Sequence, residues 1–145
     1  MAKKNNVNLI VPLDSINSRA FVDNEDNIIS NSKSIPEGLI GLDIGPKTLS
    51  KFKNIISKSK TIVWNGPMGV FEFKNFSTGT KEVAEAVASV TKRGAFSLVG
   101  GGDSISALKK FDLSSEVSYV STGGGAMLEY LEGKKLPGIA AILDN

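Results

Sequence analysis

Short apolar runs alternate with longer amphipathic segments along most of this chain. The runs typical of buried strands occupy residues 7–13, 39–44, 61–64, 95–99 and 117–120. Apolar residues at helical spacing lie between or after them, at residues 49–56, 78–92, 104–111 and 126–132. Because strands that alternate with helices form βαβ units, we expect an α/β fold with a parallel sheet covered by helices on both faces.

Two regions depart from this alternation. Residues 14–38 are rich in Asn, Ser and Asp, and we expect them to be irregular, with one hairpin at most. The apolar tail at residues 136–142 is expected to pack against the rest of the chain. Three residues mark helix boundaries: Thr48 is predicted to cap a helix, and Gly94 and Gly133 are predicted to end two others.

Four loops follow the predicted strands at their carboxyl ends. They hold residues 41–48, 65–72, 100–104 and 121–125. In parallel α/β sheets, ligands bind beyond the carboxyl ends of the strands. We therefore expect these four loops to gather along one edge and to form a binding site there.

The sharpest motif is a glycine triplet, Gly100 to Gly102, followed by Asp103 and Ser104. Glycines at the start of a helix let an anion approach the unpaired amides at the positive end of the helix dipole. We interpret this turn as a phosphate contact, with Asp103 holding Mg²⁺ and Ser104 supplying a hydroxyl. The alternative is a tight turn in which Asp103 only caps the helix.

A second triplet, Gly123, Gly124 and Gly125, also lies between a predicted strand and a helix. One interpretation is an amide cradle for a phosphoryl group during transfer, and the other is a flexible hinge. Neither triplet matches the phosphate-binding loop of Walker-type NTPases or the glycine pattern of dinucleotide-binding proteins. Two such turns in one domain nevertheless favour polyphosphate or phosphoryl-transfer chemistry.

The third motif spans residues 64–72. Its Asn65 offers amide donors to phosphate oxygens, Val70 and Phe71 could form the wall of an apolar base pocket, and Glu72 could accept from ribose hydroxyls. The structural alternative makes Trp64 and Phe71 core residues and Glu72 a solvated charge. For Trp64 we favour the core.

The amino-acid composition excludes several classes of catalytic and metal site. The 145 residues include 17 Lys and Arg and 15 Asp and Glu, for a net charge of +2, and no Cys or His. Without Cys or His, the usual catalytic triads, thiol catalysis and zinc sites are excluded, whereas phosphoryl transfer with Mg²⁺ remains possible. The scattered basic residues argue against a nucleic-acid surface. The sequence shows no apolar run of membrane-spanning length and no signal peptide, so we expect a cytoplasmic protein.

Taken in order, the motifs closely resemble the carboxyl-terminal part of phosphoglycerate kinase. The matching segments are residues 41–48, 63–72, 100–104, 121–126 and 128–139, and the resemblance runs from about residue 6 to residue 142. It implies a Rossmann-like three-layer fold, with residues 1–145 as the carboxyl-terminal portion of the nucleotide-binding domain and the amino-terminal lobe absent. It also implies transfer of a phosphoryl group between 1,3-bisphosphoglycerate and MgADP, giving 3-phosphoglycerate and ATP in glycolysis.

The resemblance assigns roles residue by residue. The residues implied to bind ADP or ATP are Gly41, Leu42, Asn65, Pro67, Gly69, Val70, Glu72, Gly101, Gly102, Asp103 and Ser104. Within that set, the adenine is bordered by Gly41, Leu42, Gly69 and Val70. The ribose meets Glu72, the Mg²⁺ ion is served by Asp103, and the others lie along the phosphates. The transferred phosphoryl group faces Gly123, Gly124 and Gly125.

Members of the family are much longer than this chain. The part that binds phosphoglycerate is missing, so we expect phosphoglycerate to bind only when that lobe is supplied and the isolated chain to be inactive. The partial sheet is expected to expose apolar surface and to self-associate, whereas the full-length enzyme is expected to be a monomer. The alternative function is a non-catalytic nucleotide- or phosphate-binding module.

Overall fold

The structure is a computed structural model that describes residues 1–25 and 27–143. Its α/β class agrees with the sequence. The α-helices are α1 (Pro46–Ile56), α2 (Thr78–Lys92), α3 (Gly102–Lys110), α4 (Gly124–Leu131) and α5 (Pro137–Leu143). The strands are β1 (Asp14–Ser18), β2 (Ile28–Asn31), β3 (Ile40–Ile44), β4 (Thr61–Asn65), β5 (Phe96–Gly100) and β6 (Tyr119–Ser121). The 3-10 turns are η1 (Ala2–Asn5), η2 (Lys74–Phe76) and η3 (Ser114–Glu116).

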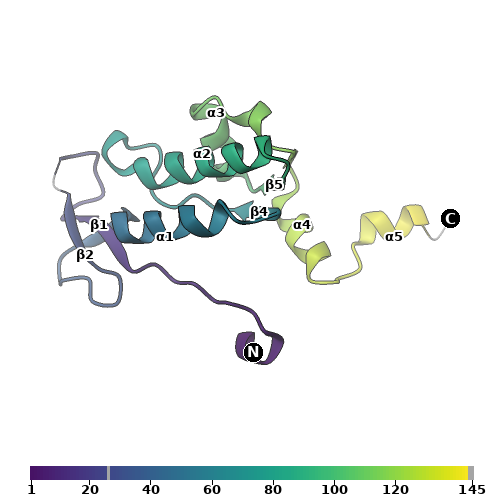
Figure 1. Cartoon of the computed structure of the whole chain (residues 1–145), viewed down its shortest axis with the longest axis horizontal. Coiled ribbons are helices and arrows are strands. Elements are labelled where there is room, and N and C mark those ends of the chain that lie inside the picture. Colours follow the sequence, from purple (N-terminus) through teal and green to yellow (C-terminus); the bar gives the residue numbers. More distant parts are fainter. Residues whose placement is uncertain (26, 144–145) are drawn as a thin grey trace.

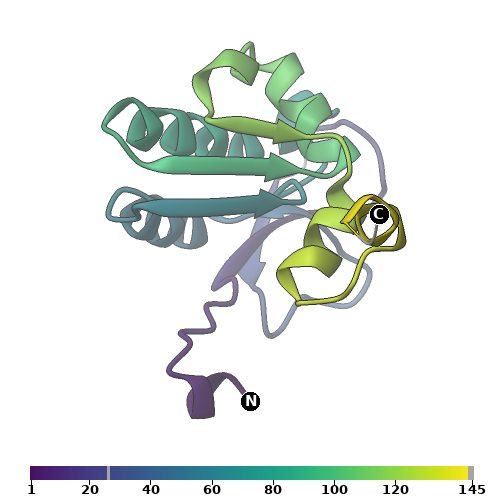
Figure 2. The ribbon, with the colours of Figure 1, turned by 90° about the vertical axis from the view of Figure 1, so that its right-hand side faces the viewer.

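The predicted parallel sheet is formed by β4, β5 and β6, in that order. Their arrowheads point to the same edge in Figure 2. Helices α1 and α2 pack side by side behind this sheet (Figures 1 and 2). Residues of α2, α3, β3 and the parallel sheet form one core of buried side chains: Ile44, Trp64, Val83, Ala84, Val99 and Leu108. The apolar stripe of α2 therefore faces the sheet, as its helical spacing predicts.

The opposite face of the parallel sheet is covered only at its carboxyl end. There α4 packs so closely that a Cβ on Gly100 would lie 2.6 Å from the Cε atom of Met127. Farther from this end, Val63, Phe96 and Tyr119 are 45%, 50% and 61% exposed. Helices thus flank both faces, but α4 alone reaches the second one and leaves much of it open.

A second sheet, with the strand order β2-β1-β3, is antiparallel. Residues 14–38 were expected to be irregular with one hairpin at most, and they contain the antiparallel strands β1 and β2, so they are more regular than expected. Strand β3 was expected in the parallel sheet, and that prediction is wrong, because β3 pairs with β1 across a register shift between Ile16 and Asn17. Since β3 ends on this second sheet, the loop after it does not leave the edge of the parallel one.

Two apolar segments near the ends of the chain also differ from expectation. Residues 7–13 do not form a strand, and Leu9 is 78% exposed, because no described strand pairs with this segment. The tail forms α5, which extends away from the body of the molecule (Figure 1). Its Ile142 is 77% exposed, so the expected close packing of the tail is not observed.

The helix boundaries are partly as predicted. Gly94 and Gly133 adopt positive φ angles of 95° and 81° just after α2 and α4, as expected for residues that end helices. Thr48 is not a cap, because α1 begins at Pro46 with Gly45 as its N-cap. Over the part of the chain that the structure describes, the helices are too short or too polar to cross a bilayer.

Candidate functional site

Three loops leave the carboxyl ends of the parallel strands next to one another. The last residues of the strands are in register: Asn65 of β4 pairs with Gly100 of β5, which pairs with Ser121 of β6. The loops that follow contain residues 65–72, 100–104 and 121–125. Three of the four predicted loops therefore share one edge of the sheet (Figure 2).

The turn between β5 and α3 requires glycine at Gly101. This residue has a φ of +91°, and a Cβ built on it would lie 2.8 Å from the Oδ1 atom of Asn65. The positive φ disfavours any larger side chain, and a Cβ would also displace the Asn65 side chain. Gly102 follows as the first residue of α3 and faces open space. The Asn65 side chain consequently lies against the backbone at the start of α3.

The turn between β6 and α4 packs directly on the first turn. A Cβ on the buried Gly124 would lie 2.6 Å from the Cα of Gly101, so the two backbones are in contact. Gly123 is the N-cap of α4, and its capping position has no side-chain hydrogen bond. Gly125 is exposed and faces open space. The free amides at the starts of α3 and α4 are thus brought to one place by glycine-to-glycine packing.

Ser104 and Asp103 take different positions in the first turn of α3. The Ser104 side chain is fully buried, and its hydroxyl oxygen accepts a hydrogen bond from the Gly66 amide at 2.7 Å. This bond fastens the β4 loop to α3. Asp103 is exposed in the first turn, while the N-cap is Gly101, which has no side-chain capping bond. The alternative in which Asp103 acts as the helix cap is therefore not observed.

The loop after β4 has a buried base and an exposed tip. Trp64 is buried and donates from Nε1 to the carbonyl of Gly66 at 2.7 Å, and Phe71 is buried as well. Both aromatic residues belong to the core, as the structural alternative held, and Phe71 is not placed to form the wall of an open pocket. Glu72 is exposed at the tip.

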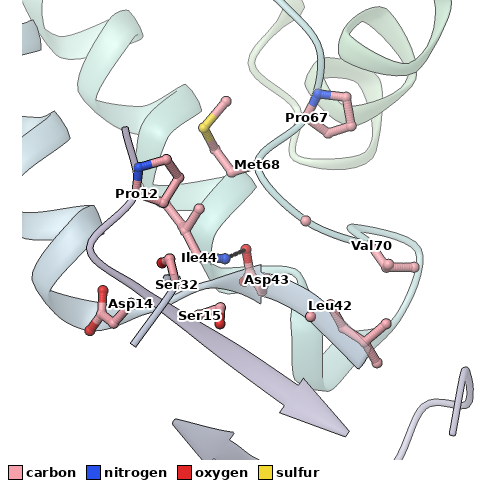
Figure 3. A pocket seen from close by; sticks show the side chains of 12 residues that line it. Pro12, Asp14, Ser15, Ser32, Leu42, Asp43, Ile44, Pro67, Met68 and Val70 are labelled. Atoms are coloured by element: carbon pink, nitrogen blue, oxygen red, sulfur yellow. Dashed lines mark hydrogen bonds between the residues drawn. The ribbon is translucent and has the colours of Figure 1, made fainter. Parts of the chain in front are cut away.

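An open cavity of about 350 Å³ lies between β3 and the β4 loop. Figure 3 shows Leu42 and Asp43 on one side of it and Pro67, Met68 and Val70 on the other. The two sides are joined by a hydrogen bond from the Val70 amide to the Leu42 carbonyl at 2.8 Å. All four residues that the resemblance places around adenine line this cavity: Gly41, Leu42, Gly69 and Val70. Although β3 lies in the other sheet, its residues still reach the loop.

Asp43 is a buried carboxylate that the sequence did not single out as functional. It accepts hydrogen bonds from the amides of Ile44 and Gly79, both at 2.8 Å, and so joins β3 to the start of α2. Burial raises its pKa to about 6, although these two amides act in the opposite direction. The Asp43 side chain also lies so close to Gly69 that there is no space for a Cβ at that position. The sequence did contain a signal for this residue, because an acidic side chain inside an apolar strand is unusual.

Asp14 makes the corresponding connection to α1. Its carboxylate accepts from the amides of Lys47 and Thr48 and from the Thr48 hydroxyl, at 3.0, 2.8 and 2.7 Å. Burial opposes ionisation, but these hydrogen bonds outweigh it and hold the pKa of Asp14 below its usual value. The start of α1 is thus capped by a residue from β1, which explains why Thr48 is buried inside the helix rather than at its N-cap.

The protein by itself offers few metal ligands at the carboxyl edge. Within residues 1–25 and 27–143, no three His, Cys, Asp or Glu side chains come together in a way that could hold an ion. Asp103 is the acidic residue in the first turn of α3.

The fold and these stacked loops define an α/β protein of the Rossmann-like class. A model of the family described as phosphoglycerate kinase matches residues 1–134. The phosphoglycerate kinase of Thermosipho africanus is 54% identical over 145 residues, which cover 99% of this chain and 36% of that protein. That of Porphyromonas gingivalis is 53% identical over 141 residues, which cover 97% and 34%.

Comparison with solved structures gives the same family. The phosphoglycerate kinase from Coxiella burnetii superposes with a TM-score of 0.86 and 44% identity over 95% of this chain and 35% of that one. The enzyme from Pyrococcus horikoshii gives a TM-score of 0.73 and 36% identity, covering 91% and 32%. The chain therefore belongs to the phosphoglycerate kinase family, and it spans about a third of the length of these relatives.

Proposed function

We propose that residues 1–145 are the carboxyl-terminal portion of the nucleotide-binding domain of a phosphoglycerate kinase and bind ADP and ATP. The observation that carries this proposal is the convergence of three loops from the parallel sheet with the cavity beside β3. Backbone amides, an exposed acid and an open cavity then lie along one edge. A nucleotide needs this combination, because its phosphates, its metal ion and its base differ in chemistry.

The base and sugar are assigned to the cavity and its rim. Gly41, Leu42, Gly69 and Val70 border the adenine, since they line one cavity whose two sides are hydrogen-bonded together. Glu72 is exposed at the tip of the same loop and accepts from the ribose hydroxyls. The buried Phe71 supports this loop from the core.

The phosphates are assigned to the glycine turn and the residues packed on it. Asn65 and Pro67 lie along them from the β4 loop, and Gly101 and Gly102 contact them from the start of α3. Ser104, which the resemblance also assigned to the phosphates, is fully buried and instead fastens the β4 loop to α3. The support is geometric: Asn65 lies over Gly101, and Ser104 ties Gly66 to the helix. The first amides of α3 have no partner within the helix and attract negative charge.

Asp103 is the residue we assign to Mg²⁺. Its carboxylate is exposed in the first turn of α3, beside the proposed phosphate positions. One carboxylate fits this ion, which is usually bound by one or two acids together with phosphate oxygens and water. When bound, Mg²⁺ neutralises negative charge on the phosphates during phosphoryl transfer.

Gly123, Gly124 and Gly125 are assigned to the phosphoryl group that moves. In the complete enzyme its bond to the acyl oxygen of 1,3-bisphosphoglycerate breaks and a bond to the terminal phosphate oxygen of ADP forms, which yields 3-phosphoglycerate and ATP. Amides at the start of α4 stabilise charge on the oxygens of this group. We place this reaction in cytoplasmic glycolysis, in an enzyme that is monomeric at full length.

Binding of MgADP to the 145-residue chain, measured by calorimetric titration, tests the proposed site. Saturable binding is expected, and Asp103→Ala and Glu72→Ala should each weaken it by about tenfold, the usual scale for losing one charged contact. Glu85→Ala is the matched control, because Glu85 is an exposed acid on α2 away from the proposed site. Absence of binding, or equal weakening by all three changes, would reject the assignment.

Catalysis is a separate test. We propose that the isolated chain is inactive, because the part of the family that binds phosphoglycerate is needed for proximity of the two reactants. Supplying that part as a second polypeptide is expected to restore ATP formation from 1,3-bisphosphoglycerate and MgADP. Nucleotide binding without turnover in that mixture would favour a non-catalytic nucleotide-binding module, and turnover by the isolated chain would contradict the proposed inactivity.

A further inference from the structure

A lysine at the end of α3 holds the tip of the β4 loop. The ammonium group of Lys110 donates to the carbonyl oxygens of Phe71 and Glu72, at 2.8 and 3.1 Å. These residues lie 39 and 38 positions away in the sequence. Hydrogen bonds from a charged donor are stronger than those between neutral groups. The carbonyl groups on both sides of the Glu72 Cα atom are therefore attached to α3.

Other hydrogen bonds hold the loop on either side of Glu72, and the Phe73 amide donates to the Val70 carbonyl at 3.0 Å. The amides of Met68 and Gly69 donate to the Thr80 hydroxyl at 3.0 and 3.2 Å, and the Val70 amide donates to the Leu42 carbonyl at 2.8 Å. These bonds fix the part of the loop that borders the cavity. Lys110 adds a hydrogen bond to the carbonyl oxygen of Glu72 itself.

Helix α3 thereby holds both ends of the loop. Its first turn accepts from Gly66 through Ser104, and its last residue, Lys110, donates to the carbonyls of Phe71 and Glu72. A helix of nine residues is rigid over about 13 Å, at 1.5 Å per residue. The distance between the phosphate end and the sugar end of the proposed nucleotide site is consequently set by one rigid element.

A carboxylate from another part of the chain lies close enough to Lys110 to influence it. Asp23 accepts from the amides of Lys74 and Asn75, at 2.8 and 3.0 Å, just after the loop. The Asn75 amide is the main cause of its lowered pKa, and the positive charge of Lys110 contributes to the same shift. The ammonium group thus faces two carbonyl oxygens and has a negative charge nearby, and these attractions hold it against the loop.

We propose that Lys110 is a positioning residue that places Glu72 against the ribose and so makes the site prefer nucleotides with ribose hydroxyls. This inference rests on the proposed nucleotide function. Lys110 does not itself contact the nucleotide; it acts through the Glu72 backbone. Its effect should therefore appear only with ligands that offer hydroxyls to Glu72.

Titration of the 145-residue chain with MgADP and with the magnesium complex of 2′,3′-dideoxyadenosine diphosphate tests this role. Lys110→Met is expected to weaken MgADP binding about three- to tenfold and dideoxy binding less than about twofold. In a Glu72→Ala background, Lys110→Met should have no further effect on MgADP. Lys110→Arg should retain most of the MgADP affinity, because it keeps a charged donor.

Lys109→Met is the matched control. Lys109 is exposed in the same last turn of α3, so this change removes the same charge from the same helix end. If Lys110→Met and Lys109→Met have equal effects, or if Lys110→Met weakens both nucleotides equally, the positioning role is wrong and the nucleotide site stands. If the unmodified chain binds neither nucleotide, the proposed nucleotide function fails and the role of Lys110 fails with it.

Discussion

Two buried aspartates connect the elements around the cavity, and their surroundings give them opposite pKa shifts. Asp14 lies at the start of α1, where burial is outweighed by hydrogen bonds from Thr48 and Lys47, and its pKa is lowered. Asp43 lies at the start of α2 with two amide donors, and burial raises its pKa to about 6. Burial raises both pKa values, but at Asp14 three hydrogen bonds and the positive charge of Lys47 outweigh it, whereas at Asp43 two amides do not.

Asp43 predicts an unusual dependence of stability on pH. Its folded pKa of about 6 exceeds the 3.8 of the ordinary group, so the folded state binds this proton more tightly. The resulting stabilisation is complete at pH values below the pKa of Asp43 in the unfolded chain. It is lost as the pH rises through the pKa of Asp43 in the folded protein. The free energy of unfolding in urea should therefore increase by about 1 kcal/mol when the pH falls from about 7 to about 5.

Asp43→Asn is the control for this prediction, because it removes the titrating group at nearly constant volume. The variant should show no such increase over the same pH range. Asp14 and Asp23 have lowered pKa values, so their titration weakens the fold only at lower pH. An increase of equal size in Asp43→Asn would assign the pH dependence to other groups.

At the scale of elements, the starts of α3 and α4 lie two residues earlier than the sequence predicts. The expected first residues were Ser104 and Ala126, whereas the helices begin at Gly102 and Gly124. Glycine has low helix propensity, so pattern analysis places a helix start after it. Packing overrides that preference here, since Gly124 lies against the backbone of Gly101.

Substitution of the two neighbouring glycines in α4 tests this packing. Gly124→Ala should destabilise the protein by about 1–3 kcal/mol, because its methyl group would overlap the Gly101 backbone. Gly125→Ala faces open space and should be neutral or stabilising by up to about 1 kcal/mol. Urea unfolding measures the free energy of unfolding of the two variants. Equal effects would show that the two glycine turns can move apart without loss of stability.

At the scale of the whole molecule, the parallel sheet is only partly covered. Strand β4 forms one edge of it, and Val63 and Phe96 lie exposed on the open face. Unpaired strand edges and exposed apolar surface both favour association between copies. This architecture fits a chain that spans about a third of the length of its relatives.

We expect the isolated chain to self-associate through this open face as its concentration rises, in sedimentation velocity experiments. Val63→Lys should reduce the association, because it places a charge on the edge strand and on the exposed face. Ile29→Lys is the matched control, since Ile29 is 57% exposed on β2 of the other sheet. A monomer at every concentration, or equal effects of the two changes, would show that the open face is not the contact surface.

The sequence alone determined the elements whose signals are local. The spacing of apolar residues predicted α2 at residues 78–92, where the structure has it, and placed β4 and β5 to within about a residue of their bounds. Trp64 was correctly favoured as a core residue. The glycine triplets predicted strand-to-helix turns, and glycine is required there by the positive φ of Gly101 and by the close approach of Gly124 to the Gly101 backbone.

Tertiary structure decided what depends on partners distant in sequence. An apolar run becomes a strand only if another strand pairs with it, so residues 7–13 are exposed and β3 joins an antiparallel sheet. The hydrogen bonds of Asp14 with Thr48, Asp43 with Gly79 and Lys110 with Phe71 join residues more than 30 positions apart, which a local pattern does not reveal. Local periodicity reports which face of an element is apolar, whereas the choice of neighbour is made by long-range contacts.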